Sequence, residues 1–471
     1  MFIHALTSLT RTDMWMLALA FALRCLLLVY VYPNRERMFN GDSYLYDGLA
    51  VHLLDTGDYR YPPADPYSDL VRPPAYPALI AFTYLMTGSR NFLFPVLWNF
   101  AGVFALYAGI KTLLEKLKCA PHTFTFFIFA VDWASVLYTK DVATEPVFTP
   151  LLVWGIVYFT GALETKRIKD ITLSSVLLSL CALMKPIALY MPVPLVVFML
   201  LDHIRRMKRF NFSALMLPTI FVLIFAAGIA PWLVRNKLKH DVWSFTSLQN
   251  DNLLFSHAAS VYAGEHHLTL KQSQDSLDAR LRQTMQPDSQ PDSYTGREAA
   301  KAKLAKDILF ADPAGYAKII LRGAAVTLFD PGRLDFNRTF KLEPIANGFN
   351  DTAVRDGLAG TVKRLFERSP VTVALLTAYL IFLVAVMSLA AVGAGPLWKK
   401  NKPATLLLLT IIFYLLILGG PNGYLRFRLY LFPFILMFVN EGLNGLKAYI
   451  RRRGGKPPSA PSLQATDFSK T

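Results

Sequence analysis

The apolar run MWMLALAFALRCLLLVYVY, residues 14–32, decides the fold class of this chain. A bilayer hydrocarbon core about 30 Å thick needs roughly 20 apolar residues in one helix, so this run is long enough to cross it. It is longer than the apolar core of a typical secretory signal, and no convincing small-x-small cleavage site follows it. We therefore expect a retained membrane span near the N-terminus.

The composition extends this reading to most of the chain. Hydrophobic residues make up 54% of the 471 residues and charged residues only 17%, which is more apolar surface than a soluble domain of this size can cover. We predict an all-α polytopic membrane protein with ten spans, plus or minus two. The predicted spans are residues 14–32, 92–113, 121–138, 143–163, 170–185, 187–203, 213–234, 371–393, 403–420 and 427–447.

Positive charge in the short loops predicts the orientation. Lys and Arg gather on the cytoplasmic side of membrane proteins, and five separate segments agree when the N-terminus is placed inside. These segments contain Lys111 to Lys118, Lys166 to Lys169, Arg205 to Arg209, Lys399 to Lys402 and Arg451 to Arg453. The net charge of +16 therefore mostly reflects the Lys and Arg residues of the predicted cytoplasmic segments. No nucleic-acid partner is expected, because such binders carry their basic face on a soluble domain.

The same topology predicts four parts of the chain. Residues 1–234 form an N-terminal transmembrane catalytic module, with a first extracytoplasmic loop at residues 33–91. Residues 235–370 form an extracytoplasmic loop or small domain, and residues 371–450 contain the C-terminal transmembrane helices. Residues 451–471 form a cytoplasmic tail that we expect to be disordered, as we expect mobility in residues 287–296.

The first loop places a carboxylate directly after the first span. Residues 39–47 read FNGDSYLYD, and apolar residues at helical spacing from residue 42 to residue 55 predict a helix on the membrane surface that ends at Gly57. A short apolar run ending at Met86 predicts a second juxtamembrane helix. Asp42 is either a catalytic carboxylate or the N-cap of the first helix, and Ser43 is an alternative cap. Asp47 is the competing catalytic base.

Charged residues recur at the predicted outer ends of the spans. Ionisable groups at membrane depth are unfavourable unless they are paired or line an aqueous cavity, so we predict that these residues ring one cavity open to the outside. They are Asp42, Arg72, Lys140, Asp141, Glu145, Lys185, Arg235, Arg426 and Arg428. Such a ring suits displacement of a lipid-linked phosphate from a sugar. A carboxylate accepts the proton of the attacking hydroxyl, and cations stabilise the departing phosphate.

Several of these residues also have an ordinary structural explanation. Arg72 can anchor a Pro-rich loop at the headgroups, and Glu145 can stabilise a helix start. Lys140 and Asp141 can pair with each other. Lys185 is flanked by apolar residues and needs a counter-charge, for which a phosphate and Glu145 are both candidates.

The two arginines before the last span are two residues apart. Arg426 and Arg428 therefore point to different faces of a helix, so that one can contact phosphate while the other reaches the interface. His257, His266 and His267 near Glu265 are interpreted as surface residues. No cofactor is predicted with certainty, and a divalent metal remains possible.

Six short motifs occur in a characteristic order. They are Gly41-Asp42-Ser43-Tyr44-Leu45-Tyr46, Arg72-Pro73-Pro74-Ala75-Tyr76-Pro77, Thr144-Glu145-Pro146, Leu183-Met184-Lys185-Pro186, Pro231-Trp232-Leu233-Val234-Arg235-Asn236 and Arg426-Phe427-Arg428-Leu429-Tyr430-Leu431-Phe432-Pro433. With this order the chain resembles GT-C type membrane glycosyltransferases of the polyprenyl-phosphate-dependent branch. That branch includes protein O-mannosyltransferases and the bacterial transferase that adds aminoarabinose to lipid A.

The resemblance implies that Asp42 matches the catalytic aspartate of the first loop. We also predict a set of substrate-binding residues, drawn from the ring of charged residues and from the motifs. These are Tyr46, Arg72, Tyr76, Lys140, Glu145, Lys185, Arg235, Arg426 and Arg428. Two departures stand out: many relatives have Asp-Glu where this chain has Asp42-Ser43, and many have Arg-Pro where it has Lys185-Pro186.

The leading hypothesis is an inverting glycosyltransferase with a polyprenyl-phosphate sugar as donor and a glycolipid, lipopolysaccharide, polysaccharide or protein as acceptor. Membrane lipids surround it, and we expect a bacterial inner membrane with the site facing the periplasm. One alternative is a lipid-linked glycan flippase or transporter, although no repeat relates the two halves and the charges gather at one face. Another is a glycan polymerase or ligase that uses a diphosphate-linked donor.

Overall fold

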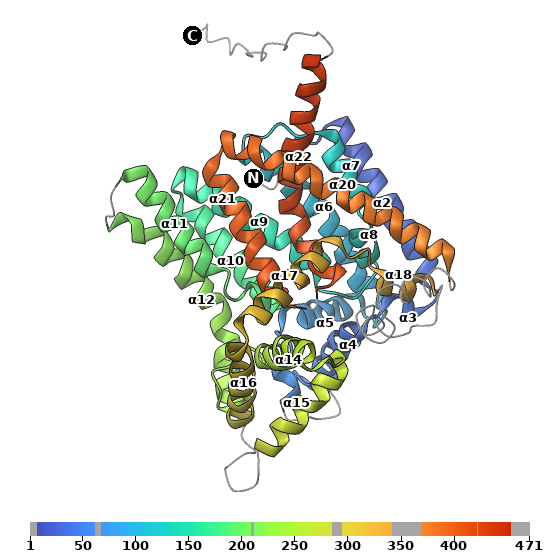
Figure 1. The fold of residues 1–471 in the computed structure, drawn as a ribbon, viewed down its shortest axis with the longest axis vertical. Coiled ribbons are helices and arrows are strands. Elements are labelled where there is room, and N and C mark those ends of the chain that lie inside the picture. Colours follow the sequence, from blue (N-terminus) through green and yellow to red (C-terminus); the bar gives the residue numbers. More distant parts are fainter. Residues whose placement is uncertain are drawn as a thin grey trace.

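The structure, a computed structural model, describes residues 7–61, 67–208, 212–284, 294–341, 369–421 and 423–453. These residues form helices and no strand, so the predicted all-α fold class is confirmed (Figure 1). Long helices pack side by side as a bundle. Three helices gather at the end of the molecule away from the C-terminal end of α22 (Leu425–Arg453), namely α14 (Ala259–His266), α15 (Leu270–Thr284) and α16 (Tyr294–Ala311).

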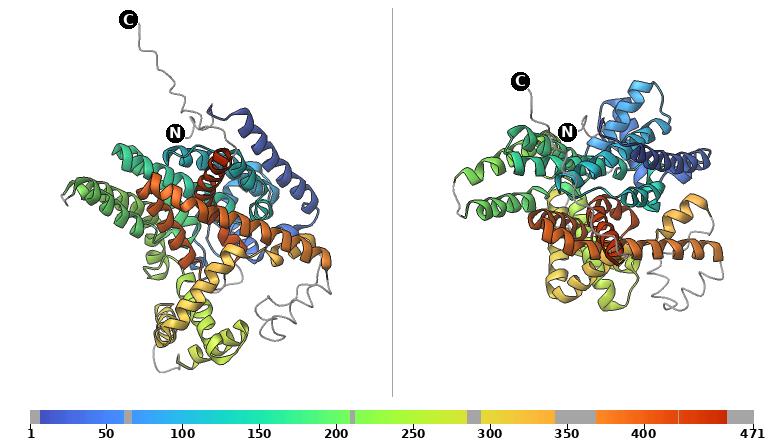
Figure 2. Two further views of the ribbon diagram at one scale, coloured as in Figure 1. Left: turned by 45° about the horizontal axis from the view of Figure 1, so that its top comes forward. Right: turned by 90° about the horizontal axis from the view of Figure 1, so that it is seen from above.

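Seven segments of the described chain are long and apolar enough to cross a membrane. They are α2 (Arg11–Val31), α6 (Leu93–Lys116), α9 (Glu145–Thr165), the stretch Pro186–Met207 that ends in α11 (Pro192–Met207), α12 (Ser213–His240), α20 (Pro370–Lys400) and α22 (Leu425–Arg453). Figure 2 shows α11 and α12 on the opposite side of the bundle from α2. The predicted spans at residues 170–185 and 403–420 are helices of 17 residues, α10 (Ile168–Met184) and α21 (Lys402–Leu418). The count of ten spans is therefore not confirmed.

The remaining predicted span, residues 121–138, is not one continuous helix. It is divided into α7 (Thr123–Val131) and α8 (Trp133–Thr139), because the side chain of Asp132 accepts a hydrogen bond from the backbone N–H of Ser135 and begins a new helix. Arg24 of α2 donates to the carbonyl oxygen of Ala130 at 3.1 Å and to the hydroxyl of Ser135 at 2.8 Å. A broken helix at membrane depth is stable only if its freed backbone groups find partners, and Arg24 supplies one.

Close packing of α6 against α9 fixes the start of α9. A side chain on Gly102 would overlap the carbonyl oxygen of Pro146, so only glycine allows the two backbones to approach this closely. Glu145, the first residue of α9, is held in the interior as a result.

The first loop contains both predicted juxtamembrane helices, α4 (Gly41–Thr56) and α5 (Ala75–Thr87). As predicted, Gly57 ends α4, and its φ of 71° favours glycine. Asn40 is the N-cap: its side chain accepts from the backbone N–H of Ser43, and the Ser43 hydroxyl accepts from that of Asn40. The interpretation of Asp42 or Ser43 as the cap is therefore wrong, and the carboxylate of Asp42 is available for other contacts.

The second large loop begins later than expected, because α12 continues through Arg235 to His240. Beyond it, α13 (Leu248–Asn252) and η3 (Leu253–Ala258) join α14 to α16 in a lobe with its own apolar core, which includes Leu254, Leu277 and Leu309. The chain then returns through α17 (Pro313–Phe329) and α18 (Arg333–Phe340).

The predictions of mobility at 287–296 and of a disordered tail at 451–471 lie outside the described residues, except that residues 294–296 begin α16 and residues 451–453 end α22.

Candidate active site

Asp42 lies between two arginines that are distant in sequence. Its carboxylate oxygens accept hydrogen bonds from Arg72, which precedes α5, and from Arg426, in the first turn of α22, each at 2.5 Å. All three side chains are partly exposed, at 22%, 18% and 27%, so a ligand can reach them. The fold thus assembles an acid and two cations from three separate motifs.

A second carboxylate extends this group. Glu145 forms an ion pair with Lys185, which follows the last residue of α10, and Nε of Arg426 lies 3.9 Å from Glu145 Oε1. The counter-charge that Lys185 requires is therefore Glu145. We call Asp42, Arg72, Glu145, Lys185 and Arg426 the Asp42 site. In it three cations face two carboxylates, which leaves one positive charge in excess.

Aromatic rings form a wall around these cations. The guanidinium of Arg72 lies 5.5 Å from the centre of the Tyr46 ring, and Tyr46 packs edge-to-face on Tyr76 at 5.1 Å. The ammonium of Lys185 lies 5.3 Å from the ring of Tyr430. The buried hydroxyls of Tyr76 and Tyr430 have no hydrogen-bond partner among the described residues. Tyr46 and Tyr430 thus lie against cations of the Asp42 site, and Tyr76 packs behind Tyr46. Substrate binding by Tyr46 and Tyr76 stays a prediction, and the sequence analysis did not single out Tyr430.

Asp42 is ionised at neutral pH. Burial alone raises the pKa of its carboxyl, but the positive charges of Arg72 and Arg426 outweigh that effect and hold the pKa below its usual range. An ionised carboxylate only accepts hydrogen bonds, so it can take a proton from a hydroxyl group that approaches it.

Lys140 lies in a different cluster. Its ammonium donates to the carbonyl oxygen of Arg37 at 2.5 Å and to the carboxylate of Asp141 at 2.6 Å, and its side chain is only 1% exposed. The pairing of Lys140 with Asp141 is therefore confirmed. Arg338 of α18 completes the pair by binding the other oxygen of Asp141 at 2.5 Å.

Asp335 belongs to the same buried cluster. It lies 3.3 Å from Arg338 and accepts a hydrogen bond from the hydroxyl of Tyr138 at 3.0 Å. Burial raises the pKa of Asp335 to about 6, and the negative charge of Asp141 adds to this shift. We call Lys140, Asp141, Asp335 and Arg338 the Asp335 cluster. The sequence analysis missed Asp335 and Arg338, because a charged pair in a polar loop gives no signal of burial.

Arg235 is also remote from the Asp42 carboxylate. It forms an ion pair with Asp69 and donates to the carbonyl oxygen of Tyr59 at 3.3 Å, while His240 contacts the same Asp69 carboxylate at 2.9 Å. These contacts fasten the stretch before Arg72 to the end of α12, so Arg235 acts on the site by positioning that stretch.

Arg428 points away from Arg426, as the spacing predicted. Its guanidinium is fully buried and donates to the carbonyl oxygens of Thr327 and Leu328 at 3.3 Å and of Asp330 at 2.9 Å. Carbonyl groups in the last turn of a helix lack intrahelical partners and carry partial negative charge. Arg428 thus stabilises the C-terminal end of α17, and the structure does not bring it to Asp42.

Asp47, the competing base, lies elsewhere on α4. It accepts hydrogen bonds from Arg35 and from the hydroxyl of Tyr84, each at 2.6 Å. Asp42 is therefore the carboxylate of this helix that faces the cations of the Asp42 site.

The histidines of the large loop have protein partners. His257 contacts the hydroxyl of Tyr316 at 3.1 Å, and the His266 ring stacks on Tyr262. Within the described ranges, no three His, Cys, Asp or Glu side chains are grouped so that they could hold a metal ion. A role for a divalent metal stays a prediction.

Comparison with known proteins identifies the N-terminal half of the bundle. Residues 71–234 match the model of a family described as dolichyl-phosphate-mannose-protein mannosyltransferase. The matched segment makes up less than half of the 471 residues. It carries Arg72, Glu145 and Lys185 of the Asp42 site, whereas Asp42 and Arg426 lie outside it and join it through the fold. The match confirms the resemblance recognised from the motifs, and the chain is a multi-span membrane protein.

No curated protein sequence matches the chain. Among solved structures, the archaeal oligosaccharyltransferase AglB from Archaeoglobus fulgidus, in complex with an inhibitory peptide and a dolichol-phosphate, is 11% identical with a TM-score of 0.48, over 94% of this chain and 52% of that chain. The apo form of an oligosaccharyltransferase from the same organism is 13% identical with a TM-score of 0.49, over 95% and 53%.

A third solved structure is ArnT from Cupriavidus metallidurans bound to undecaprenyl phosphate. It is 13% identical with a TM-score of 0.39, over 95% of this chain and 81% of that chain. The chain thus spans about half the length of the two archaeal proteins. We base no conclusion about activity on likeness at this level.

Proposed function

We propose that this chain transfers a sugar from a polyprenyl-phosphate donor to an extracytoplasmic acceptor, with Asp42 as the general base. The observation that carries the proposal is the contact of the Asp42 carboxylate with both Arg72 and Arg426 in a group that has one excess positive charge. A carboxylate between cations provides both a base for the attacking hydroxyl and positive charge for the departing phosphate.

The reaction begins with the phosphate of the donor binding to the cations. Arg72 and Arg426 present planar guanidinium groups that match phosphate oxygens, and Lys185 adds a third positive charge beside them. These cations stabilise the negative charge that grows on the phosphate as the bond from its oxygen to the anomeric carbon breaks. The departing group is the polyprenyl phosphate.

Binding of the phosphate also prepares the base. In the structure both oxygens of Asp42 are engaged by arginines, which lowers the pKa of the carboxyl and makes it a weak base. A phosphate that engages Arg72 and Arg426 competes for those hydrogen bonds, so the pKa of Asp42 rises when the donor is in place. Asp42 then accepts the proton of the acceptor hydroxyl as that hydroxyl attacks the anomeric carbon.

A single displacement of this kind inverts the anomeric configuration, since the hydroxyl attacks from the face opposite the departing phosphate. We also propose the orientation that the charged loops predict, in which the Asp42 site faces the extracytoplasmic side of a bacterial inner membrane. The acceptor classes are a glycolipid, lipopolysaccharide, polysaccharide or protein.

Replacement of Asp42 tests the base directly. Asp42→Asn keeps the shape of the side chain and removes its charge, so we expect transfer from a polyprenyl-phosphate sugar to fall by roughly 10²- to 10⁴-fold. The matched control is Asp47→Asn, on the same helix, which should retain activity because Asp47 contacts Arg35 and Tyr84 instead. Both variants are compared by transfer rate after equal insertion is established. Full activity in Asp42→Asn would contradict the assignment.

The same purified protein separates the alternatives. A flippase changes the side of the membrane on which the lipid-linked sugar lies without breaking a bond, so it releases no polyprenyl phosphate. A polymerase or ligase uses diphosphate-linked donors, whereas the proposed enzyme uses monophosphate-linked donors. Release of polyprenyl monophosphate that depends on Asp42 is the expected result.

A further inference from the structure

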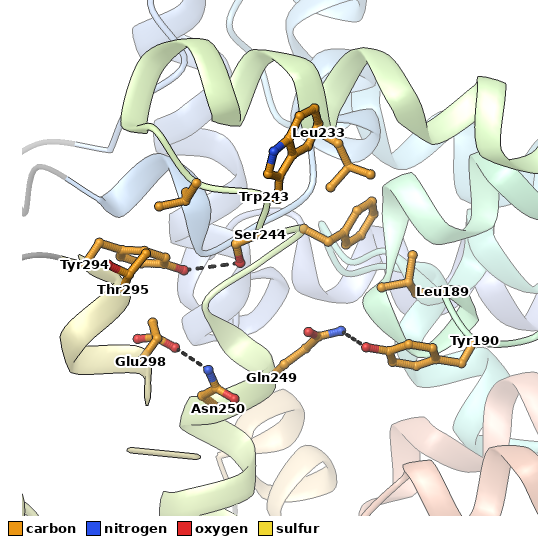
Figure 3. Close-up of a pocket in the computed structure, with 12 residues that line it drawn as sticks. Leu189, Tyr190, Leu233, Trp243, Ser244, Gln249, Asn250, Tyr294, Thr295 and Glu298 are labelled. Carbon is orange, nitrogen blue, oxygen red and sulfur yellow. Dashed lines mark hydrogen bonds between the residues drawn. The ribbon is translucent and has the colours of Figure 1, made fainter. Parts of the chain in front are cut away.

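A pocket of about 430 Å³ is lined by residues 189–190 before α11, by Leu233 of α12, by residues 242–245 and 249–250 after α12, and by the start of α16 (Figure 3). In Figure 3, Tyr294 and Glu298 of α16 lie on one side of it and Leu189 and Tyr190 on the other, with Trp243 above and Gln249 below. This volume is within the range of small-molecule sites, roughly 300 to 1,000 Å³.

The pocket is joined to both loops that carry cations of the Asp42 site. On one side, the hydroxyl of Thr246 donates to the carbonyl oxygen of Val71 at 2.8 Å, directly before Arg72. On the other side, the backbone N–H of Ala188 donates to the carbonyl oxygen of Lys185 at 3.1 Å, directly before Leu189 of the lining. The lining residues Phe245 and Leu189 are therefore each one residue away in the chain from a hydrogen bond to the stretch that carries Arg72 or Lys185.

The chemistry of the lining differs from that of the Asp42 site. None of the twelve lining residues is Lys or Arg, so the pocket does not suit a phosphate. Its one charged residue, Glu298, is already paired with Lys301 at 2.7 Å and accepts a hydrogen bond from Asn250 at 3.0 Å. The pocket is thus built for an uncharged ligand.

The remaining groups suit a sugar ring. The amide of Gln249 donates to the hydroxyl of Tyr190 at 2.9 Å, that of Asn250 donates to Glu298, and the hydroxyl of Ser244 contacts that of Tyr294 at 3.4 Å. Amides and hydroxyls each make more than one hydrogen bond, so these groups can also bind the hydroxyls of a sugar. Trp243 lies beyond the end of α12 and is 68% exposed. It presents an aromatic face that can pack on the apolar face of a pyranose. Hydroxyl-rich edges and an apolar face on one ligand are characteristic of carbohydrates.

We propose that this pocket binds an uncharged sugar unit of the acceptor. The proposal deepens the proposed function and rests on it, since an acceptor is defined only if the chain transfers sugar. The acceptor is then a carbohydrate. The phosphate of the donor lies at Arg72, Lys185 and Arg426, and the acceptor ring lies on the other side of the loops that carry Arg72 and Lys185.

A binding measurement tests the pocket without any transfer reaction. Purified full-length protein in detergent is titrated with methyl glycosides and disaccharides of mannose, glucose and N-acetylglucosamine, with ligand-observed NMR as the readout. We expect at least one of them to bind the unmodified protein and Asp42→Asn equally. Trp243→Ala and Gln249→Ala should each weaken that binding by roughly tenfold, about 1.4 kcal/mol, and Trp243→Phe should restore part of it.

Trp15→Ala is the matched control, because Trp15 is 64% exposed on α2 and distant in sequence from the pocket. An exposed Trp near the end of a span commonly anchors the protein at the membrane interface. If Trp243 had only that role, Gln249→Ala would not weaken sugar binding. The proposal is overturned if none of these sugars binds the unmodified protein, or if both pocket variants bind as it does.

A transfer assay then identifies the source of the sugar. With a polyprenyl-phosphate donor and a carbohydrate acceptor, Trp243→Ala and Gln249→Ala should raise the KM for the acceptor by roughly tenfold and leave that for the donor unchanged. A rise confined to the donor KM would overturn the acceptor assignment. If the unmodified protein transfers no sugar yet binds glycosides through Trp243, the proposed function fails while the sugar-binding pocket stands.

Discussion

The Asp42 site and the Asp335 cluster are built from the same kinds of residue and differ in charge balance and access. In the Asp42 site three cations face two carboxylates, and the side chains of Asp42, Arg72 and Arg426 are partly exposed. In the Asp335 cluster two cations face two carboxylates, and Lys140, Asp141 and Asp335 are no more than 3% exposed. A balanced, closed cluster joins helices together, whereas an unbalanced, accessible one can receive an anion.

Removal of one arginine from each group is expected to give the largest contrast. Arg426→Gln leaves Asp42 with Arg72 and Glu145 with Lys185, so each acid keeps a cation and the fold persists, while transfer falls by roughly 10²- to 10³-fold. Arg338→Gln leaves Asp141 and Asp335 with Lys140 alone, which should destabilise the protein by about 3 to 5 kcal/mol.

Transfer kinetics and thermal unfolding in detergent, measured on both variants, check this contrast. In the folded fraction of Arg338→Gln the KM for the donor should equal that of the unmodified protein. The comparison between the two groups is broken if Arg426→Gln unfolds the protein and Arg338→Gln loses activity without loss of stability.

The pH dependence of stability gives a second contrast, of intermediate size. The pKa of Asp335 in the folded protein is about 6, above its ordinary value of 3.8, because burial disfavours the charged form. The native state therefore binds a proton more tightly than the unfolded state, and stability falls as pH rises from about 4 to about 6. Asp335→Asn should remove this loss and stabilise the protein above pH 6, by at most about 3 kcal/mol.

Asp42→Asn should change the stability of the protein in the opposite direction. The pKa of Asp42 is lowered in the folded protein by Arg72 and Arg426, so its contribution to stability is present above the unfolded pKa and is lost as pH falls through the folded pKa. The asparagine variant should therefore be less stable than the unmodified protein at neutral pH. Unfolding midpoints of both variants between pH 4 and pH 8 test whether the two substitutions change stability in opposite directions. A change in the same direction would contradict the environments described for Asp335 and Asp42.

The smallest expected effect is that of Lys185→Arg. The chain has Lys185-Pro186 where many relatives have Arg-Pro, and both side chains carry the charge that Glu145 requires. We expect the transfer rate to change by only about threefold, since the charge persists while the donor geometry changes. Lys185→Gln should reduce the rate much further, and equal rates for the two variants would remove Lys185 from the site.

Much of the Asp42 site followed from the sequence because each of its residues is a charge at the end of an apolar segment. Asp42, Arg72, Glu145, Lys185 and Arg426 were all predicted to share one face, and the structure brings these five together. The sequence did not separate them from Lys140, Arg235 and Arg428, which occupy similar places in the pattern. Apart from Asp141 beside Lys140, their partners are backbone carbonyls and an acid of distant segments, and only the folded chain supplies those.

The fold was predicted in outline for a similar reason. Apolar length identified the segments, whereas the division of residues 121–138 at Asp132 depends on Arg24, more than 100 residues earlier in the chain. The pocket shown in Figure 3 was not predicted at all. Its lining comes from residues 189 to 298 on separate elements, and of the twelve lining residues only Leu233 belongs to one of the six motifs.

Arg24 has a consequence for how the protein is made. A charged side chain within a span disfavours insertion by about 2.5 to 3.5 kcal/mol near the helix centre. The carbonyl oxygen of Ala20 in α2 itself accepts one hydrogen bond from Arg24, whereas Ala130 and Ser135 are synthesised more than 100 residues later. Until Ala130 and Ser135 are in place, α2 is an incompletely stabilised span, so its stability in the bilayer depends on the later assembly of the bundle.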